Sequence, residues 1–412
     1  MLIRFVINIV FLLLIALLFL IIKNKTRKAG YLEIYSLLWL LLIAGCQLIG
    51  GIYEIQDSTL FIFYMTWIMF LVPSLLIYEN CSENEKYSHK PVKNKLKLML
   101  FFLISISLFV NLLSLYSLIG SINFFKLGLL ALRVQGKEII DEQSTIFYQL
   151  FAKSYIIYIP LAMIGYKNKY INKATLVLCC IVGLFTCVIN LTRAPVLSWA
   201  ITIITSTTIC FNVSGKKFYS YIALLITPVL LITLLFGMEN EQLLENVKLY
   251  VFGGVKAYEM ILSGRYSDLS FYDIGLYSTD FFNYTLKKMG LVERYPSLIR
   301  EYTYAPPTNV YTYLDALTLD FGVIGAILSA LILGTIAAYV HKKAHSTNDI
   351  LYISYYCFIN YAIAISFMNN ELIRINGFIL IAELVIIRMV IQPVLQDATN
   401  PYQLVDFKND VQ

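Results

Sequence analysis

Charged side chains are scarce in this sequence, at 14% of 412 residues, while hydrophobic residues make up 59%. A soluble domain usually carries about 25% charged residues. One protein core cannot hide this much apolar surface, so the excess must face lipid, and the composition predicts a membrane protein. The formal net charge of +6 does not indicate nucleic-acid binding, because the lysines cluster in short segments between apolar runs.

Several chemical motifs are also missing. The chain has no GxxxxGK[ST] phosphate-binding loop, which argues against a nucleotide-driven motor, and no CxxC pair with metal-ligand spacing. Six of the seven cysteines lie in apolar runs, where cysteine behaves as a small hydrophobic residue. No internal repeat is evident, which disfavours the common transporter folds. We therefore expect neither a metal nor another cofactor.

Apolar runs of membrane-spanning length recur along the chain. A helix crosses a bilayer with about 20 mainly apolar residues. The first run lacks a small-residue cleavage site and ends in a lysine-rich segment, so we interpret it as a retained helix rather than a signal peptide. We expect an all-α polytopic membrane protein, with residues 1–412 as one membrane domain. About eleven runs meet or approach the required length, at residues 2–22, 34–54, 59–78, 98–120, 146–165, 174–190, 195–211, 220–236, 322–340, 350–368 and 375–391.

Lysine and arginine in alternate connecting segments predict the orientation of these helices. One set of segments, which includes residues 23–28, 86–97 and 167–173, carries 16 positive residues, and the short segments of the other set carry five. Positive residues accumulate on the cytoplasmic side of a membrane. This places the N-terminus outside, the C-terminus in the cytoplasm and the polar segment 237–309 on the outer side.

Residues 237–309 are too long and too polar to be a simple turn. They contain nine tyrosines, nine acidic residues and seven basic residues. Disordered segments are poor in aromatic residues, and long loops that are not disordered are usually functional. We expect a folded outer cap with short amphipathic helices, for example at residues 243–252.

Arg193 lies in a short outer segment between two short predicted spans. A cation there opposes the orientation signal and is costly near lipid, and charges in such places usually serve a function. A guanidinium group matches phosphate oxygens in a bidentate way. The functional interpretation is therefore an anion clamp, and the structural one is a side chain that extends to lipid headgroups.

Further arginines occur on the predicted outer side. Arg374 lies three residues from Glu371 in a second short turn, where the two charges either take part in chemistry or only pair with each other. In the long segment, Arg265, Arg294 and Arg300 suit a diphosphate site, and the tyrosines suit stacking on sugars. The alternatives are a solvated charged face and tyrosines that face lipid headgroups.

Two charges fall within predicted spans. Lys153 either extends to the surface or faces an internal cavity, and Glu383 serves either proton-coupled transport or a structural hydrogen bond. The three histidines, His89, His341 and His345, all fall in predicted cytoplasmic segments. Chemistry on the outer side is therefore left with Glu, Asp and Tyr as candidate bases.

The stretch PTNVYTYLD at residues 307–315, followed by DFGVIG at 320–325, resembles a signature of bacterial oligosaccharide repeat-unit polymerases, the Wzy-type O-antigen polymerases. In that family an Asn-Val-Tyr-Thr stretch leads to Asp-Phe-Gly just before a transmembrane helix. The segment TRA at 192–194 resembles the family's arginine-containing turn, and YVFGG at 250–254 resembles a stretch that opens its large outer loop.

The resemblance implies a GT-C-like helical fold in the bacterial inner membrane, with a periplasmic N-terminus, a large periplasmic loop and no metal. The implied activity is that of a glycosyltransferase, which moves a growing glycan from its undecaprenyl diphosphate to the sugar of an incoming undecaprenyl-diphosphate-linked oligosaccharide. The expected partners are that substrate, membrane lipid and a polysaccharide chain-length regulator. Nucleic acid is not among them.

Preorganised guanidinium groups neutralise a leaving diphosphate without a metal, and a carboxylate serves as the base. An O-antigen ligase and a transporter or flippase of the lipid-linked oligosaccharide remain alternative functions, although no outer histidine is predicted for a His-based ligase mechanism.

We expect Asp320 and Gly322 to shape the start of a helix. The expected catalytic residues are Arg193, Glu301 and Glu371. The residues expected to bind substrate are Arg265, Arg294, Arg300, Arg374, Tyr311 and Asp315.

Overall fold

In the computed structural model, the described regular elements are all helices. The helices are α1 (Leu2–Thr26), α2 (Tyr31–Ile49), the 3-10 helix η1 (Gly51–Tyr53), α3 (Asp57–Glu79), α4 (Lys93–Ser121), α7 (Tyr155–Lys167), α8 (Lys173–Ile189), α9 (Arg193–Phe211), α11 (Asn240–Leu262), α13 (Asp315–Thr347), α14 (Ile350–Ala364) and α15 (Ile375–Ile391). The structure describes residues 2–26, 30–79, 92–121, 151, 153–189, 193–213, 220, 240–263, 277–279, 283, 286, 290–291, 312–347, 349–368, 370–371 and 375–391.

Six of the described helices are long and apolar enough to cross a membrane, namely α1, α2, α3, α4, α9 and α13. Three shorter apolar helices, α7, α8 and α14, accompany them. The chain is therefore a helical membrane protein, which confirms the all-α prediction. A described helix overlaps every predicted span except 220–236, which lies almost wholly outside the described residues. The number of eleven spans stays a prediction.

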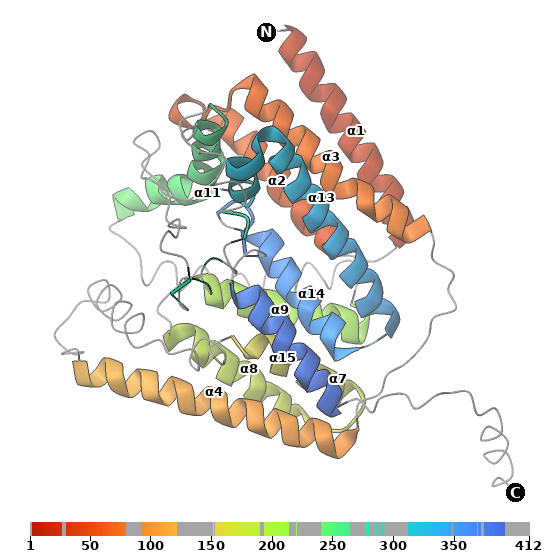
Figure 1. Cartoon of the computed structure of the whole chain (residues 1–412), viewed down its shortest axis with the longest axis vertical. Helices are drawn as coiled ribbons and strands as arrows, with labels where there is room; N and C mark the ends of the chain where they lie inside the picture. The colour runs from red at the N-terminus through yellow and green to blue at the C-terminus, as the bar shows by residue number, and fades with distance from the viewer. Residues whose placement is uncertain are drawn as a thin grey trace, which may run out of the picture.

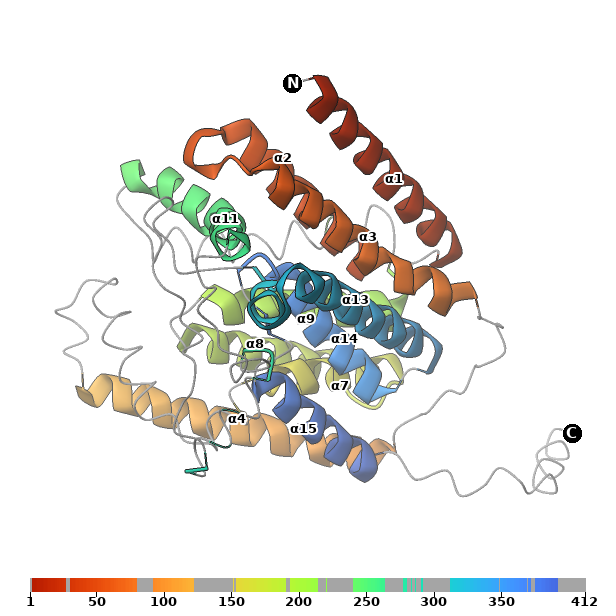
Figure 2. The ribbon, with the colours of Figure 1, turned by 45° about the horizontal axis from the view of Figure 1, so that its top comes forward.

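The helices pack in a continuous series from α1 to α4. Helix α1 packs on α3, α3 on α13, α13 on α14, and α14 on α9. The series continues through α7 and α8 to α4, so that α1 and α4 lie on opposite sides of the bundle (Figures 1 and 2). Helix α15 packs on α14 and α4, α2 packs on α14 and α3, and α11 packs on α13 and α2. Helices α13 and α14 thus join the two halves.

Apolar side chains at both outer helices face away from the protein. Leu13 on α1 is 64% exposed, and Leu98 and Phe101 on α4 are 70% and 72% exposed. Hydrocarbon chains solvate such surfaces, whereas in water a patch of this extent would be a liability. The core between them is aromatic, and the rings of Tyr35 and Phe70 stack with their centroids 3.6 Å apart.

The helix ends form two groups. At the lysine-rich end, Lys342 donates a hydrogen bond to the carbonyl oxygen of Ile77 at 3.2 Å, and one pocket brings Lys97 together with Lys167. At the opposite end, the backbone amide of Gln56 donates to Glu259 of α11 at 2.7 Å. The described parts of the positively charged segments thus lie together at one end of the bundle, as their alternation along the sequence predicted.

One boundary differs from its prediction. Helix α13 continues to Thr347, so His341 and His345 belong to the helix rather than to a loop. His341 is buried, accepts or donates a hydrogen bond with the hydroxyl of Tyr78, and lies among the rings of Tyr31 and Tyr356. The polar sequence around His341 predicts a solvated loop. Helix α13 continues through it because the aromatic neighbours bury the imidazole.

Candidate functional site

The DFGVIG segment bends α13 near its start. Gly322 adopts φ +61° and ψ −147°, a conformation that favours glycine, and divides α13 into residues 315–321 and 323–347. The bend brings Gly325 against the carbonyl group of Leu317, so closely that a β-carbon at Gly325 would lie 1.7 Å from its oxygen. Both glycines are therefore required by the backbone, as the sequence suggested for Gly322.

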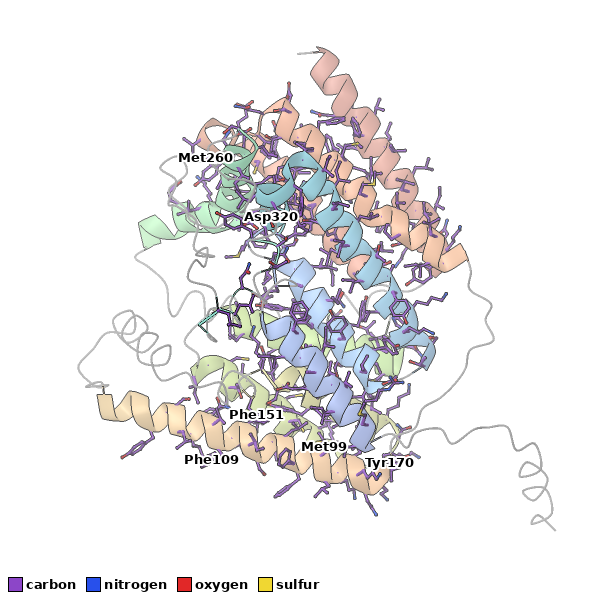
Figure 3. All side chains as sticks on the ribbon, in the orientation of Figure 1. Met99, Phe109, Phe151, Tyr170, Met260 and Asp320 are labelled. Carbon is purple, nitrogen blue, oxygen red and sulfur yellow. The ribbon has the colours of Figure 1, made fainter. Side chains whose placement is uncertain are left out.

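Asp320 holds a neighbouring segment at this bend. Its carboxylate accepts hydrogen bonds from the backbone amides of Tyr277 at 3.2 Å and Ser278 at 2.7 Å. In Figure 3, Asp320 lies near Met260 of α11, on the other side of the bundle from Met99 and Tyr170. Two amides on one carboxylate are a strong anchor, because each bond is charge-assisted. Asp320 is thus a positioning residue for the predicted outer segment.

The turn before α13 is tied to the turn after α14. The backbone amide of Tyr313 donates to the carbonyl oxygen of Ser366 at 2.6 Å, and Asn370 donates to the carbonyl oxygen of Tyr313 at 2.9 Å. The hydroxyls of Tyr35 and Tyr313 are hydrogen-bonded at 2.9 Å. These bonds fix the segment that carries part of the sequence signature beside Glu371.

Glu371 pairs with Lys153 across the bundle. Their Nζ and Oε2 atoms lie 3.5 Å apart, and the side chain of Glu371 is only 4% exposed while that of Lys153 is 31% exposed. Lys153 lies in the turn just before α7, which begins at Tyr155, inside the predicted span 146–165. The lysine therefore presents a partly accessible cation beside a buried carboxylate.

The start of α9 lies close to this pair. The carbonyl oxygen of Pro195 accepts hydrogen bonds from the hydroxyl of Tyr155 at 3.3 Å and from the thiol of Cys187 at 3.2 Å. Pro195 follows the first residue of α9, Arg193, by two positions, and Tyr155 follows Lys153 by two. The backbone of Arg193 and the Lys153–Glu371 pair therefore occupy neighbouring helix starts at one end of the bundle.

Helix α11 closes the same end. Its Glu259 is buried and accepts from the amide of Gln56, from the hydroxyl of Thr59 at 3.3 Å and from Lys256. Phe252 packs on Gly45 of α2, where a β-carbon would lie 2.3 Å from the phenyl ring. The expected amphipathic helix at 243–252 is thus part of a longer helix, and the YVFGG stretch is its contact with α2.

Burial removes one tyrosine from the candidate bases. Desolvation raises the pKa of Tyr313 well above its ordinary value of 10, and the neighbouring Tyr35 raises it further. Tyr313 therefore stays protonated near neutral pH and acts through its hydrogen bonds. Tyr313 is therefore not a candidate base, whereas the carboxylates at this end remain candidates.

Three of the nine predicted site residues fall within the described part of the chain. Glu371 and Asp315 lie at the same end of the bundle, and Asp315 begins α13, where an acidic residue is favoured by the helix dipole. Arg193 begins α9, and its side chain lies outside what the structure describes. The remaining predicted residues lie outside the described residues altogether: Arg265, Arg294, Arg300, Glu301, Tyr311 and Arg374.

Sequence reasoning missed the Lys153–Glu371 contact. It considered Arg374 as the partner of Glu371 because the two are three residues apart, whereas Lys153 is distant in the chain. The available signal was that Lys153 lies within the outer half of a predicted span, where a cation needs a partner, and that Glu371 lies in a short outer turn. Among the described residues, no group of three or more His, Cys, Asp or Glu side chains is arranged to hold a metal ion.

Comparison with known proteins finds no matching family model, no matching curated protein and no matching solved structure. The class that the fold defines is that of a helical integral membrane protein. The site lies at the end of the bundle opposite the lysine-rich end. It combines Arg193 at the start of α9, the Lys153–Glu371 pair, and Asp320, which anchors a connecting segment.

Proposed function

We propose that this protein is a glycosyltransferase of the Wzy polymerase type, which joins undecaprenyl-diphosphate-linked oligosaccharides into a surface polysaccharide. We assign the reaction to the end of the bundle opposite the lysine-rich end. We place it at the periplasmic face of a bacterial inner membrane, because lysine-rich segments mark the cytoplasmic side. A GT-C-like arrangement of eleven spans belongs to the same proposal.

The proximity of the Lys153–Glu371 pair to the start of α9 carries this proposal. A glycosyl transfer from a lipid diphosphate needs positive charge at the leaving group and a proton acceptor near the attacking hydroxyl. Lys153 and Arg193 supply the first, and Glu371 supplies the second. The NVYT and DFG signature supports the same end, because Tyr313, Asp315 and Asp320 lie there.

In the proposed reaction, a hydroxyl of the incoming lipid-linked unit attacks the anomeric carbon of the growing chain. The new carbon–oxygen bond forms as the bond between that carbon and the diphosphate oxygen breaks. The Glu371 carboxylate takes the hydroxyl proton, and the diphosphate leaves with the bonding electrons. Arg193 and Lys153 stabilise the charge that develops on the diphosphate.

A deletion strain separates this proposal from its alternatives. Loss of a polymerase leaves single repeat units on the final acceptor, and loss of a ligase leaves polymer on the lipid carrier. Loss of a flippase leaves lipid-linked units in the inner leaflet. The gel profile of surface glycan, together with the leaflet that holds the accumulated unit, is therefore the decisive measurement.

Complementation then tests the arginine. Arg193→Ala is expected to reduce long polysaccharide by about 100-fold or more, because one preorganised charge-stabilising group is worth that much. Arg193→Lys restores charge without the planar fork and is expected to recover only part of the polymer. Lys248→Ala is the matched control, because Lys248 lies on α11 and pairs with exposed Glu245. Normal chain lengths in Arg193→Ala, with normal insertion, contradict the proposal.

A further inference from the structure

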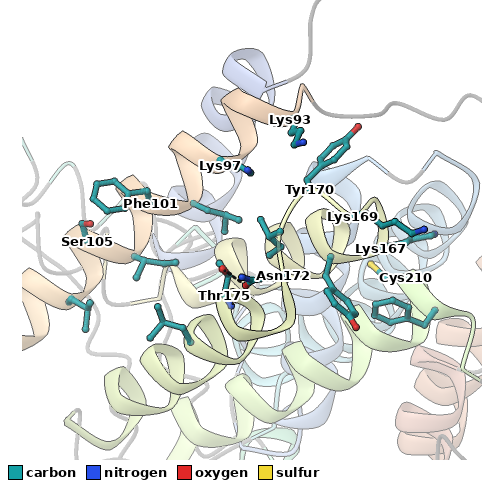
Figure 4. Close-up of a pocket in the computed structure, with 17 residues that line it drawn as sticks. Lys93, Lys97, Phe101, Ser105, Lys167, Lys169, Tyr170, Asn172, Thr175 and Cys210 are labelled. Atoms are coloured by element: carbon teal, nitrogen blue, oxygen red, sulfur yellow. Dashed lines mark hydrogen bonds between the residues drawn. The ribbon is translucent and has the colours of Figure 1, made fainter.

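The lysine-rich end contains a pocket that the proposed chemistry does not use. It has a volume of about 1190 Å³ and lies between the start of α4, the α7–α8 connection, α8 and the end of α9. Four lysines line it, Lys93 and Lys97 from α4 and Lys167 and Lys169 from the end of α7 (Figure 4). No acidic residue is among its lining side chains, so the pocket has four formal positive charges.

The two lysines of α4 lie where the local electrostatic potential disfavours a cation. Lys93 is the first residue of α4, and the N-terminus of a helix has a partial positive charge that disfavours a cation. Lys97 follows one turn later on the same face, where like charges repel. Within the described part of the chain, neither lysine takes part in an ion pair. A bound anion at this position satisfies both lysines and the helix terminus.

Lys169 provides an independent observation. It adopts φ +59°, in the left-handed region where a side chain is strained and glycine is favoured. The turn closes helix α7 through a hydrogen bond from the amide of Tyr170 to the carbonyl oxygen of Gly165 at 2.8 Å. A glycine at 169 would relieve this strain, so the lysine costs conformational energy that the turn itself does not need. Its amine lines the same pocket as Lys93 and Lys97.

Apolar side chains continue the pocket along the membrane. Leu100, Phe101, Ile104 and Leu108 of α4 line it on one side and Leu178 of α8 on the other. Phe101 is 72% exposed and Leu178 is 50% exposed, so this wall opens towards lipid. The site therefore has a cationic part at the helix ends and an apolar part along the spans. Asn172 and Thr175, hydrogen-bonded to each other at 2.8 Å, add polar groups near the cationic part.

We propose that this pocket binds an anionic glycerophospholipid of the leaflet on the lysine-rich side, with its phosphate among the four lysines and its acyl chains along α4 and α8. Charge complementarity selects the anionic headgroup, because basic pockets between membrane helices on the cytoplasmic side recognise such lipids. The apolar wall selects a lipid over a free phosphate. The inference is independent of the proposed polymerase activity, which lies at the opposite end.

Lipid binding to the purified full-length protein tests this site. Native mass spectrometry with phosphatidylglycerol and phosphatidylcholine is expected to show tighter retention of the anionic lipid, by about tenfold or more. Removal of Lys93 and Lys97 together, as K93Q/K97Q, is expected to lower that affinity by about 25-fold, since each lysine near an anionic headgroup contributes about fivefold. The matched control K25Q/K343Q removes two lysines from the same end that do not line the pocket, and its affinity should not change.

Lys169→Gly separates a binding role from a structural one. The glycine fits the left-handed conformation, so the variant is expected to unfold at an equal or higher temperature. It is nevertheless expected to lose about fivefold in affinity for phosphatidylglycerol. Equal retention of the two phospholipids, unchanged affinity in K93Q/K97Q, competition by inorganic phosphate alone, or preferential retention of a polyprenyl phosphate would each overturn the proposal.

Discussion

At the lysine-rich end, cations line an open pocket, and the pairs Lys23–Glu33 and Arg388–Asp349 join helix ends. At the opposite end, buried carboxylates accept hydrogen bonds from the backbone of connecting segments, as Glu259 and Asp320 do. A carboxylate that accepts from backbone amides fixes the position of a loop, whereas a lysine at a helix end mainly orients the helix in the membrane. Glu259 and Asp320 thus fix the position of connecting segments at the opposite end, and the proposed glycosyl transfer needs such fixed geometry.

The largest expected difference between the ends concerns the Lys153–Glu371 pair. Glu371→Gln is expected to lower polymer yield by about 100-fold, a typical loss for a general base. Loss of Lys153 alone would also remove a cation from beside a buried carboxylate, which is destabilising. The double variant Lys153→Met/Glu371→Leu should therefore recover thermal stability and membrane insertion but not polymer, as measured by unfolding in detergent and by glycan gels.

The exposed pair Lys248–Glu245 is the matched control for that experiment, because Glu245 is 67% exposed on α11. Replacement of both residues by alanine should leave polymer length and stability unchanged. If the Lys153/Glu371 double variant restores full polymerisation, the pair has only a structural role and the comparison between the ends fails.

A smaller effect is expected where α13 crosses α3 between the ends. A β-carbon at Gly334 would lie 2.3 Å from the carbonyl oxygen of Phe70, and a backbone group cannot easily move away. Gly334→Ala is expected to destabilise the fold by about 1–3 kcal/mol, the usual cost of overpacking. Polymer made per folded molecule should stay normal, which thermal unfolding and glycan gels together can check.

Gly50 offers the matched control, because it has φ +64° but a β-carbon added there would meet no other atom within 4 Å. Gly50→Ala should cost about 1 kcal/mol through backbone strain alone. A larger loss of stability in Gly50→Ala than in Gly334→Ala would show that the close approach of α3 and α13 does not determine the stability of the fold.

Effects of similar size on stability are expected at two buried aspartates, one at each end of the bundle. Asp320→Ala removes two charge-assisted hydrogen bonds and should cost about 2 kcal/mol, with faster amide exchange at Tyr277 and Ser278. Asp349→Ala removes the N-cap of α14, where its carboxylate accepts from the amide of Leu351 at 2.9 Å, together with the ion pair to Arg388, and should cost about 1–2 kcal/mol. Exchange at residues 277–278 should rise only in the first variant, and a rise in both would mean that the two ends are not independent.

Span positions were predictable because a bilayer sets both the length and the polarity of a helix. Helices α1, α3 and α4 begin and end within a few residues of the predicted runs 2–22, 59–78 and 98–120. Helix α7 was less predictable, because its described start at Tyr155 follows a turn at Lys153 that hydropathy does not mark. The continuation of α13 through His341 depends on aromatic partners from other helices.

The candidate site was predictable only in part. The DFG segment indicated the start of a helix, and Gly322 and Asp320 perform that local role. The contact of Glu371 with Lys153 was not predictable, because it depends on how α7 packs against α14. The pairing of Glu371 with Arg374 stays a prediction, because Arg374 lies outside the described residues.

The bend in α13 has a consequence for the depth of the protein in its membrane. Gly322 and Lys342 are separated by about 30 Å along the helix at a rise of about 1.5 Å per residue, which equals the hydrocarbon thickness of a typical bilayer. Lys342 resists entry into hydrocarbon, since its ammonium would lose its hydration. With one edge of the hydrocarbon held at this lysine, the bilayer thickness places the other edge at the bend. The membrane thus keeps buried Asp320 and the segment that it anchors just outside the hydrocarbon.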